Sequence, residues 1–449
     1  MNIVSDRLRL VVGLGETGKS VASYLHEEGM AFMLADTREN PPHLAAIKRR
    51  MPEVRIYLGD LPKSVMQMVD EVILSPGLPL SHPIAQLARE LDKPIISDIE
   101  LWRRSVTRPV IAVSGSNGKS TVASLLSLMG EAQGLRVASG GNLGCPVLDL
   151  DKQADLYIIE ISSFQLDITT NLAADVACLL NITPDHMERY NSFGDYYHSK
   201  HKIFNGCGAV VYNRGDKLTR PLELPAASTC FSGGQPDLNE FGIIERQDGI
   251  YLAHSHKTLI NVNELKIIGQ HNYQNILAAL SVAKLQDWDL AKCLAAVKDF
   301  KGLEHRCQWV AAKNDVVYIN DSKATNPEAA CASLLSVAAM CRGNIHMILG
   351  GSCKNADFSA LTAAISKVGD KKQVMSYLIG EEAENLNGVL TNTAHNEMCA
   401  SLPDAMNKIV AAVKPSDMVL LSPACASFDA YDNFAARGEH FMELVGAIS

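Results

Sequence analysis

Short segments rich in Val, Ile and Leu alternate with helical stretches along the whole chain. This alternation favours parallel sheets with helices on both faces, and it disfavours β-sandwiches and helix bundles. The predicted fold class is therefore α/β. At 449 residues the chain is long enough for about three domains, and a hydrophobic fraction of 47% allows each domain to bury its own core.

The strand candidates fall into three groups, and each group predicts one domain, at residues 1–97, 98–303 and 304–449. The strand candidates are residues 8–12, 31–35, 72–74, 94–96, 110–113, 156–161, 176–180, 316–319, 346–349, 374–379 and 418–421. Residues 209–261 are rich in turn residues and short alternating runs, which predicts a β-rich insertion in the second domain. An alanine-rich helix that begins near Asn272 is expected to close that domain.

Charge and composition disfavour several classes of protein. The net charge of −9 disfavours nucleic acid as a principal partner, because nucleic-acid-binding proteins usually carry a basic face. No apolar run reaches the roughly 18 residues needed to span a bilayer, and the N-terminus lacks a secretory signal, so we expect a cytoplasmic protein without membrane insertion. The eleven cysteines include no CxxC pair and are interpreted as reduced core residues, not as a disulfide framework or a zinc site.

Residues 108–130, RPVIAVSGSNGKSTVASLLSLMG, run from an apolar segment through a glycine-bracketed turn into a helix. Gly115 and Gly118 let backbone N–H groups approach phosphate oxygens, and Lys119 adds a positive charge. The hydroxyl of Ser120 or Thr121 can hold Mg²⁺. The segment predicts a nucleoside triphosphate site, with a plain strand-to-helix turn as the alternative. The predicted phosphate-binding residues are Gly115, Ser116, Asn117, Gly118, Lys119, Ser120 and Thr121.

A second glycine-rich loop, GLGETGKS at residues 13–20, satisfies both the dinucleotide fingerprint and the GxxxxGK[ST] pattern. The loop at residues 108–130 fits the second pattern less well, because Val113 stands where its first glycine is expected. However, Asp36 ends the next strand candidate, where a Rossmann unit places an acid for a ribose hydroxyl. This context favours a nucleoside diphosphate group in the first domain, with Lys19 in solvent. NAD(P), ATP and a tight structural turn stay open.

Three polar groups follow successive strand candidates of the second domain. Lys119 follows the first strand, Glu160 ends the second, and His186 follows the third. Ligands of such sheets gather at the carboxyl ends of the strands, so these groups are expected to meet. A carboxylate and an imidazole beside a triphosphate suit Mg²⁺ coordination. The alternatives are a buried, paired carboxylate for Glu160 and a cap or loop contact for His186.

The third domain carries polar residues after three of its strand candidates. They are Asp321, Lys323 and Thr325 after the first, Lys354 after the second, and Ser427 with Phe434 after the third. If the last segment is helical from about Ser427, then Ser427 and Phe434 lie on one face and can line a pocket. The alternatives are a capped loop before a helix that starts at Pro327, and a core position for Phe434.

The loop GSNGKST resembles GTNGKST of the Mur ligase family, ATP-dependent amide-forming enzymes of peptidoglycan precursor synthesis; Ser116 replaces a threonine and keeps the hydroxyl. The likeness covers nearly the whole chain. In the third domain, DSKATNP, LSPACASFD and NFAARGEHF resemble the D-glutamate-adding members. The resemblance implies Rossmann-like domains at both ends of the chain and a P-loop-type ATPase domain with a parallel sheet between them.

The resemblance also implies a reaction, in which D-glutamate is joined to UDP-N-acetylmuramoyl-L-alanine through an acyl phosphate, giving ADP and phosphate. It implies ATP as co-substrate, two Mg²⁺ ions, small-molecule partners only and a monomer. Three alternatives stay open. They are a sibling ligase that adds another amino acid, an NAD(P)-dependent oxidoreductase and an inactive nucleotide-binding module.

Roles for individual residues follow from the same resemblance. Lys200 and Lys202 open a helical stretch, where lysines would otherwise be interpreted as solvent-exposed. Lys200 matches the lysine that is carbamylated in the family. The implied catalytic residues are Lys119, His186, Lys200 and Lys323, and the implied metal-binding residues are Thr121, Glu160, His186 and Lys200. The implied nucleotide contacts outside the phosphate loop are Asn272, Arg306 and Asp321. The implied substrate-binding residues are Gly15, Thr17, Asp36, Thr37 and Gly77 for UDP, Asn142 and His186 beside the acyl acceptor, and Thr325, Lys354, Ser427 and Phe434 for D-glutamate. For Asn142, which lies in a glycine-rich loop, a turn asparagine is the alternative.

Overall fold

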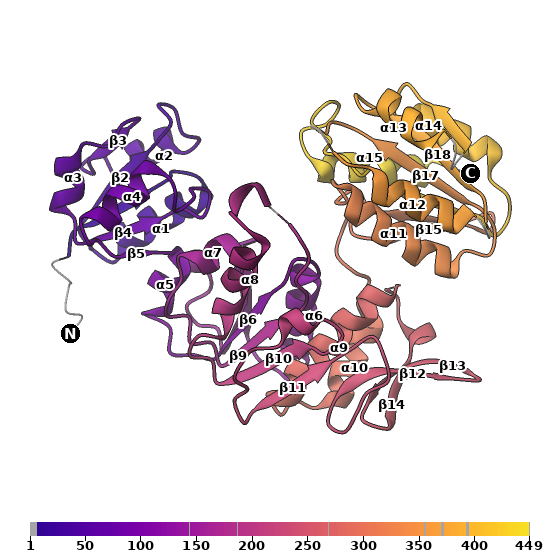
Figure 1. Ribbon diagram of the computed structural model, residues 1–449, viewed down its shortest axis with the longest axis horizontal. Helices are drawn as coiled ribbons and strands as arrows, with labels where there is room; N and C mark the ends of the chain where they lie inside the picture. The colour runs from indigo at the N-terminus through magenta and orange to yellow at the C-terminus, as the bar shows by residue number, and fades with distance from the viewer. Residues whose placement is uncertain are drawn as a thin grey trace. The chain divides into compact units, whose positions relative to one another are not determined.

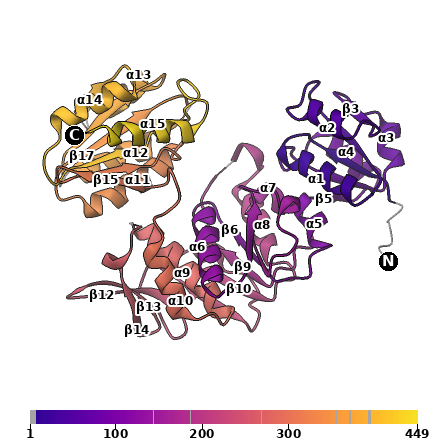
Figure 2. The same ribbon diagram turned by 180° about the vertical axis from the view of Figure 1, so that it is seen from behind.

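The computed structural model describes residues 7–142, 144–185, 187–267, 269–353, 356–369, 372–391 and 395–448, which contain three sheets (Figures 1 and 2). The chain forms two compact units, Met1–Asn261 with Gln274–Val297, and Val262–Tyr273 with Lys298–Ser449. The sheets are mostly parallel and alternate with helices, so the predicted α/β class is confirmed. The predicted domain boundaries stay predictions. Among the described residues, no helix has both the length and the hydrophobicity needed to cross a membrane.

The first sheet is fully parallel and has the order β3-β2-β1-β4-β5. Its strands are β1 (Arg9–Val12), β2 (Phe32–Asp36), β3 (Ile56–Leu58), β4 (Glu71–Leu74) and β5 (Ile95–Ile96), and its helices are α1 (Glu16–Glu27), α2 (Leu44–Arg50), α3 (Lys63–Met68) and α4 (Pro83–Glu90). The strand order reverses between β1 and β4. Sheets of this kind bind ligands at that switch point, outside the carboxyl ends of the strands.

The second sheet has the order β14-β13-β12-β11-β10-β9-β6-β8-β7. Its strands are β6 (Val110–Ser114), β7 (Val137–Gly141), β8 (Leu156–Glu160), β9 (Val176–Leu179), β10 (Ala209–Asn213), β11 (Ser228–Phe231), β12 (Phe241–Arg246), β13 (Gly249–His254) and β14 (Lys257–Asn261). The strands β12, β13 and β14 form an antiparallel meander, whereas the other pairs are parallel. The β-rich insertion predicted at residues 209–261 is therefore confirmed.

Six α-helices of the described residues accompany the second sheet. They are α5 (Asp98–Arg103), α6 (Lys119–Ala132), α7 (Ser163–Asp167), α8 (Phe193–His201), α9 (Gln270–Leu285) and α10 (Leu290–Asp299). Local capping explains several of their starts, because Ser162 and Gln165 form a capping box at α7, and Ser192 accepts a hydrogen bond from the backbone of Asp195 at α8. The alanine-rich helix α9 begins two residues before the predicted position, Asn272.

The third sheet has the order β15-β16-β20-β17-β18-β19, and only the β15–β16 pair is antiparallel. Its strands are β15 (Gln308–Lys313), β16 (Val316–Asn320), β17 (Ile345–Gly350), β18 (Val374–Ile379), β19 (His395–Met398) and β20 (Met418–Leu421), and its helices are α11 (Pro327–Met340), α12 (Ser359–Gly369), α13 (Ala383–Leu390), α14 (Leu402–Ala412) and α15 (Phe434–Gly446). As expected for a capped loop, α11 starts at Pro327, and the Asn326 side chain accepts from the Ala329 backbone N–H at 2.8 Å. Two apolar clusters cover the sheet.

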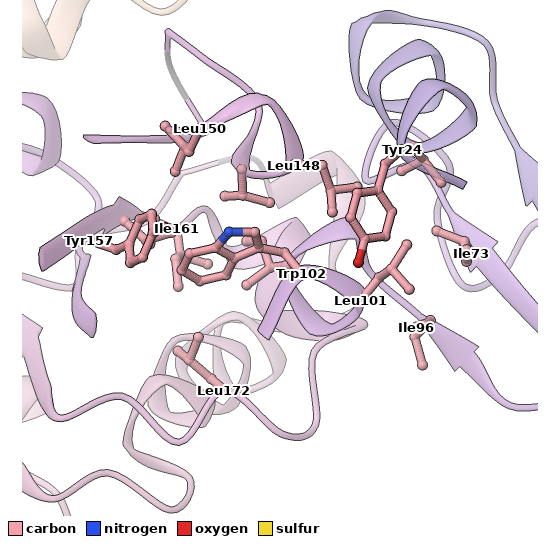
Figure 3. Close-up of a cluster of buried hydrophobic side chains, with 14 of the residues drawn as sticks. Tyr24, Ile73, Ile96, Leu101, Trp102, Leu148, Leu150, Tyr157, Ile161 and Leu172 are labelled. Atoms are coloured by element: carbon pink, nitrogen blue, oxygen red, sulfur yellow. The ribbon is translucent and has the colours of Figure 1, made fainter. Parts of the chain in front are cut away.

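One continuous apolar cluster joins the first sheet to the second (Figure 3). Trp102 of α5 meets Tyr157 of β8 edge to face, with ring centroids 5.1 Å apart. Tyr24 of α1 and Leu148 belong to the same cluster. Because apolar contacts continue between the two sheets, they form one compact unit.

Helix α5 begins with a buried acidic residue. Ser97 caps this helix by accepting from the Glu100 backbone N–H at 3.0 Å, and its hydroxyl lies 2.7 Å from that of Thr169. Asp98 follows at 3% exposure, and its Oδ1 atom has no hydrogen-bond partner among the described residues. Burial raises the pKa of Asp98 to about 6.

We expect ionisation of Asp98 to lower the free energy of unfolding as the pH rises from about 4 to 7. The variant Asp98→Asn is expected to lack this contribution. The folded-state pKa of about 6 exceeds the ordinary value of 3.8, so the contribution of Asp98 to stability is complete below pH 3.8 and lost above pH 6. A shift of this size corresponds to about 3 kcal/mol. Urea unfolding of both proteins across this pH range measures the difference. Parallel pH profiles for the two proteins would contradict the prediction.

Candidate functional site

The turn between β6 and α6 has the geometry of a phosphate-binding loop. Gly115 has φ 155° and Gly118 has φ 85°, so both adopt backbone conformations that favour glycine. Two hydrogen bonds hold the loop in place. The hydroxyl of Ser116 lies 2.7 Å from that of Tyr196, and the Asn117 N–H donates to Oδ1 of Asn181 at 2.8 Å. Helix geometry leaves the first-turn N–H groups of α6 without intrahelical partners. At the end of this hydrogen-bonded loop they can therefore donate to phosphate oxygens.

Gly118→Ala is expected to raise the KM for ATP roughly tenfold or more, the factor that about 1.4 kcal/mol of lost binding causes. A Cβ atom at this position would lie 2.4 Å from Oδ1 of Asn275, so the loop must shift. Gly134, just beyond the end of α6, is the matched control. Its φ is 87° and a Cβ atom there would meet nothing within 4 Å, so Gly134→Ala carries the same backbone strain without the collision. Steady-state kinetics of both variants measure the KM for ATP. Equal values would refute the requirement for glycine at residue 118 in ATP binding.

Two lysines converge on the same loop. The Lys119 ammonium donates to the carbonyl oxygens of Gly115 at 2.9 Å and Ser116 at 3.0 Å. The Lys200 ammonium donates to the Gly115 carbonyl at 2.8 Å. Burial, reinforced by the positive charge of Lys119, holds the pKa of Lys200 well below its ordinary value.

The interpretation of Lys200 as a solvent-exposed residue is wrong, because its side chain is 2% exposed. It lies on the face of α8 that packs onto the end of β6, where Ser114 Oγ is 3.4 Å from its ammonium nitrogen. Lys202, two residues further on, is partly exposed and pairs with Asp167 at 3.4 Å. Lys200 lies in the last turn of α8, whereas Lys202 begins the short 3-10 helix Lys202–Phe204 that follows it.

Glu160 ends β8, the immediate neighbour of β6, and is 3% exposed. Its Oε1 atom accepts from the Asn142 side chain at 2.9 Å, and its carbonyl accepts from the Asn142 N–H at 2.8 Å. The charge of Glu160 also acts on Lys200. The structure thus brings Lys119, Glu160 and Lys200 to one edge of the sheet, with Thr121 in the first turn of α6. His186 lies outside the described residues.

The glycine loop of the first domain is organised around Asp36. Its carboxylate accepts from the Leu14 N–H at 2.6 Å and from the Arg38 guanidinium at 2.9 and 2.8 Å. Burial works to raise the pKa of Asp36, but the hydrogen bonds from Arg38 and Leu14 outweigh it and lower the value. Sequence reasoning missed Arg38; an arginine two residues after the strand-ending acid was the available signal. Lys19 is half exposed, with Glu16 3.7 Å away, in line with its expected solvation.

The remaining residues predicted for the UDP group lie beyond the carboxyl ends of β1, β2 and β4, on loops or, for Thr17, in the first turn of α1. They are Gly15, Thr17, Thr37 and Gly77, all at least partly exposed. Arg189, which sequence reasoning missed, donates to the carbonyls of Gly77 at 3.1 Å and Leu78 at 2.9 Å, and its guanidinium lies 4.1 Å from the centroid of the Phe164 ring. It therefore ties the Gly77 loop to the segment that follows β9.

In the third sheet, Asp321 lies just beyond the end of β16 and is buried. Its two oxygens accept from the Cys307 N–H at 3.0 Å and the Ser422 hydroxyl at 2.7 Å. Burial raises the pKa of Asp321 to about 6, and the nearby positive charge of Arg306 opposes this. Asn272, predicted for the same ligand, is largely buried in the first turn of α9.

Lys323 and Phe434 form a pair. The Lys323 ammonium lies 3.8 Å from the centroid of the Phe434 ring, within cation–π range. Phe434 is the first residue of α15, and Asn433 caps this helix. The expectation that Ser427 and Phe434 share a helix face is wrong, because Ser427 precedes the helix in a loop. Ser427 is 2% exposed and its hydroxyl has no hydrogen-bond partner among the described residues.

Arg437, which sequence reasoning missed, connects the loops around this site. It is 1% exposed and donates to Ser322 Oγ at 3.0 Å and to the carbonyls of Ser322 and Cys425, both at 3.0 Å. Arg437 and His440 also line a cavity of about 550 Å³ beyond the ends of β17 and β18. Of the residues predicted for D-glutamate, the three that the structure describes, Thr325, Ser427 and Phe434, do not line this cavity. Thr325 follows Lys323 in the loop before α11, and Lys354 lies outside the described residues.

Three family descriptions match successive parts of the chain. The Mur ligase MurD-like N-terminal domain matches residues 7–97, the Mur ligase middle domain matches residues 113–283, and the Mur ligase glutamate ligase domain matches residues 305–425. Together they span the three sheets.

Three relatives that match over nearly their full length share the same name. The UDP-N-acetylmuramoylalanine--D-glutamate ligase of Pseudomonas fluorescens (strain Pf-5) is 43% identical over 99% of this chain and 98% of its own length. The ligases of the same name from Hahella chejuensis and Pseudomonas aeruginosa are 41% and 42% identical, again over 99% of this chain and 99% and 98% of their own lengths. Among solved structures, the UDP-N-acetylmuramate-alanine ligase of Thermotoga maritima is 18% identical with a TM-score of 0.60, over 98% of this chain and 99% of its own, which shows a shared fold.

Proposed function

Because this chain belongs to the Mur ligase family, we propose that it joins D-glutamate to UDP-N-acetylmuramoyl-L-alanine and converts ATP to ADP and phosphate. The full-length relatives confirm the family predicted from the sequence motifs and support this reaction. The observation that carries the proposal is the convergence of Lys119, Lys200 and Glu160 on the loop after β6. We further propose that the enzyme acts as a monomer in the cytoplasm, where ATP is available.

The phosphate loop supplies the electrostatics of the first step. The alanyl carboxylate attacks the γ-phosphorus of ATP, so an acyl phosphate forms and ADP leaves. Negative charge on the transferring group is stabilised by Lys119 and by the N-terminal N–H groups of α6. In the structure Lys119 donates to two loop carbonyls. Phosphate oxygens are charged acceptors and form stronger hydrogen bonds with it.

The oxygen donors beside this loop fit Mg²⁺, which prefers such ligands and keeps several waters. Glu160 would hold it with a buried carboxylate and Thr121 with its hydroxyl, and His186 is a further predicted contact. When bound, Mg²⁺ neutralises phosphate charge. Asn142 orients the Glu160 carboxylate through its side-chain amide.

The environment of Lys200 supports carbamylation. Only a neutral amine attacks CO₂, and the lowered pKa of Lys200 increases that fraction. The amine forms a bond to the carbon of CO₂ and releases a proton, so a cation becomes an anion. This change would remove the repulsion between Lys200 and Lys119, and the carbamate oxygens would hold a second Mg²⁺.

In the second step, residues at the ends of the third sheet are proposed to bind the reacting groups. The amine of D-glutamate attacks the acyl phosphate carbonyl and phosphate leaves. We propose that Lys323, held against Phe434, steadies the phosphoryl group, and that Ser427 donates to a carboxylate of the amino acid. The buried Ser427 hydroxyl suits this role because it has no hydrogen-bond partner among the described residues. Thr325, Lys354 and Phe434 complete the proposed D-glutamate contacts. The proposed nucleotide contacts outside the phosphate loop are Asn272, Arg306 and Asp321.

Phosphate release by the purified protein tests the proposal. The assay contains Mg²⁺ and ATP, with UDP-N-acetylmuramoyl-L-alanine and D-glutamate added separately and then together. L-Glutamate, lysine and diaminopimelate replace D-glutamate in control reactions. Release only when the muramoyl substrate and D-glutamate are both present is the expected result. Activity with another amino acid alone would keep the ligase chemistry and refute the assignment of the third-domain site.

A further inference from the structure

Two cysteines face each other across the loops that follow β17 and β20. They are Cys353 and Cys425, both free thiols. Their neighbours Ser352 and Ala426 form an antiparallel bridge, in which each N–H donates to the other's carbonyl, at 2.9 and 3.1 Å. Residues 353 and 425 are therefore the next pair along two antiparallel segments.

This position has the backbone spacing of a disulfide. Because Ser352 and Ala426 exchange both hydrogen bonds, Cys353 and Cys425 occupy a non-hydrogen-bonded pair, where Cα atoms lie roughly 4.5 Å apart. Disulfides span Cα distances of about 4.4 to 6.8 Å. The Cys353 sulfur lies 3.5 Å from the Ala424 carbonyl oxygen, so its side chain points toward the second loop.

The two thiols differ in exposure and acidity. Cys353 is partly exposed, whereas Cys425 is fully buried. The neighbouring thiol of Cys425 lowers the pKa of Cys353, and the thiol of Cys353, with burial, raises the pKa of Cys425. Cys353 is thus the accessible thiol with more thiolate character, and Cys425 is placed to react with it in a second step.

We propose that Cys353 and Cys425 form a reversible disulfide with hydrogen peroxide as the oxidant, and that the bond impairs the amino-acid site. The Cys353 thiolate attacks one peroxide oxygen, giving a sulfenic acid and releasing hydroxide. The Cys425 sulfur then attacks the Cys353 sulfur, and water leaves. Two thiols and one peroxide thus give one disulfide and two waters, with two electrons passing to the peroxide. A dithiol reductant restores both thiols by exchange.

The effect on the amino-acid site rests on the proposed function. Cys353 immediately precedes Lys354, and Cys425 lies two residues before Ser427, both predicted to bind D-glutamate. Arg437 donates to the carbonyl of Cys425 at 3.0 Å, so this loop is already held on its other side. A covalent bond between the sulfurs would tie the two loops together and restrict their adjustment to the amino acid. The KM for D-glutamate is therefore expected to rise roughly tenfold or more, as when one charge-assisted hydrogen bond is lost.

The test treats the full-length protein with hydrogen peroxide and follows two independent readouts. Peptide mapping by mass spectrometry is expected to find a Cys353–Cys425 link that a dithiol removes. Kinetics on the same samples are expected to show the rise in the KM for D-glutamate, with recovery after reduction. Cys353→Ser, in its reduced state, is expected to keep the wild-type KM and to lose the response to peroxide.

Cys331→Ser is the matched control, because Cys331 is also partly exposed and lies on α11 of the same unit. It is expected to respond to peroxide as the wild type does. A peptide map without the 353–425 link would overturn the disulfide whatever the activity. A link that leaves the KM for D-glutamate unchanged would overturn its effect on the site. Failure of the proposed function itself is separate, since the reduced protein would then release no phosphate with D-glutamate.

Discussion

Lys119→Met is expected to abolish turnover, whereas Lys19→Met is expected to leave kcat near the wild-type value. Both lysines follow a glycine loop and open a helix, and the loop at residues 13–20 fits the triphosphate pattern better. Their surroundings differ. Lys119 donates to two carbonyls of the loop after β6, beside the buried Lys200 and Glu160, whereas Lys19 is half exposed near Glu16. Loss of one preorganised cation in such a site typically costs about a hundredfold to a thousandfold in kcat.

Phosphate-release kinetics of the two variants measure this difference, with thermal unfolding as a check that both fold. Methionine keeps the length of the apolar stem and removes the charge. At most, Lys19→Met is expected to raise the KM for the UDP-linked substrate. If Lys19→Met lost kcat while Lys119→Met kept it, ATP would belong to the first loop and the site assignment would be reversed.

Lys200→Arg is expected to lower kcat roughly a hundredfold or more, although the positive charge is retained. Arginine stays protonated and cannot form a carbamate, so the proposed anionic Mg²⁺ ligand is lost. The larger guanidinium must also fit beside the Gly115 carbonyl, where the Lys200 ammonium is 2.8 Å away. Lys202→Arg is the matched control, because Lys202 is partly exposed and pairs with Asp167 in the same part of the chain. It is expected to retain near wild-type kcat.

A second measurement on the wild type separates carbamylation from a packing defect in the variant. Enzyme depleted of CO₂ is expected to lose activity and to recover it when bicarbonate is added. Lowering the pH during depletion is expected to hasten the loss, because protonation favours decomposition of the carbamate. Full activity of Lys200→Arg, or activity that ignores CO₂ in the wild type, would refute the carbamate.

Much of the fold and part of the site were predictable because the relevant signals are local. Buried parallel strands are short apolar runs, and every strand predicted in the three sheets is present. The strands that were missed carry weak signals. β3 and β15 consist of half-buried and exposed residues, β19 reads HNEM and is largely exposed, and β7 contains two glycines. Such strands are stabilised by pairing with a buried neighbouring strand, so a pattern of apolar residues does not identify them.

The carboxyl-end rule also predicted which residues would meet. Lys119 follows β6 and Glu160 ends β8, and these two strands pair in parallel, so residues 41 positions apart in sequence lie at the same edge of the sheet. The rule had no means of placing residues on helices or on long loops. Lys200 was therefore misplaced in solvent, and the predicted helix from Ser427 to Phe434 was in fact a loop followed by a cap at Asn433.

By itself the sequence determined the α/β class, the two glycine loops, the family motifs and the residues at the strand ends, because each depends on neighbours within a few positions. Only the tertiary structure decided how those residues behave. The pKa of Lys200 depends on burial against Gly115 and on Lys119, and the facing of Cys353 and Cys425 depends on an antiparallel bridge between segments more than 70 residues apart. Burial and pairing at such separations follow from strand order and helix packing, which no local pattern specifies.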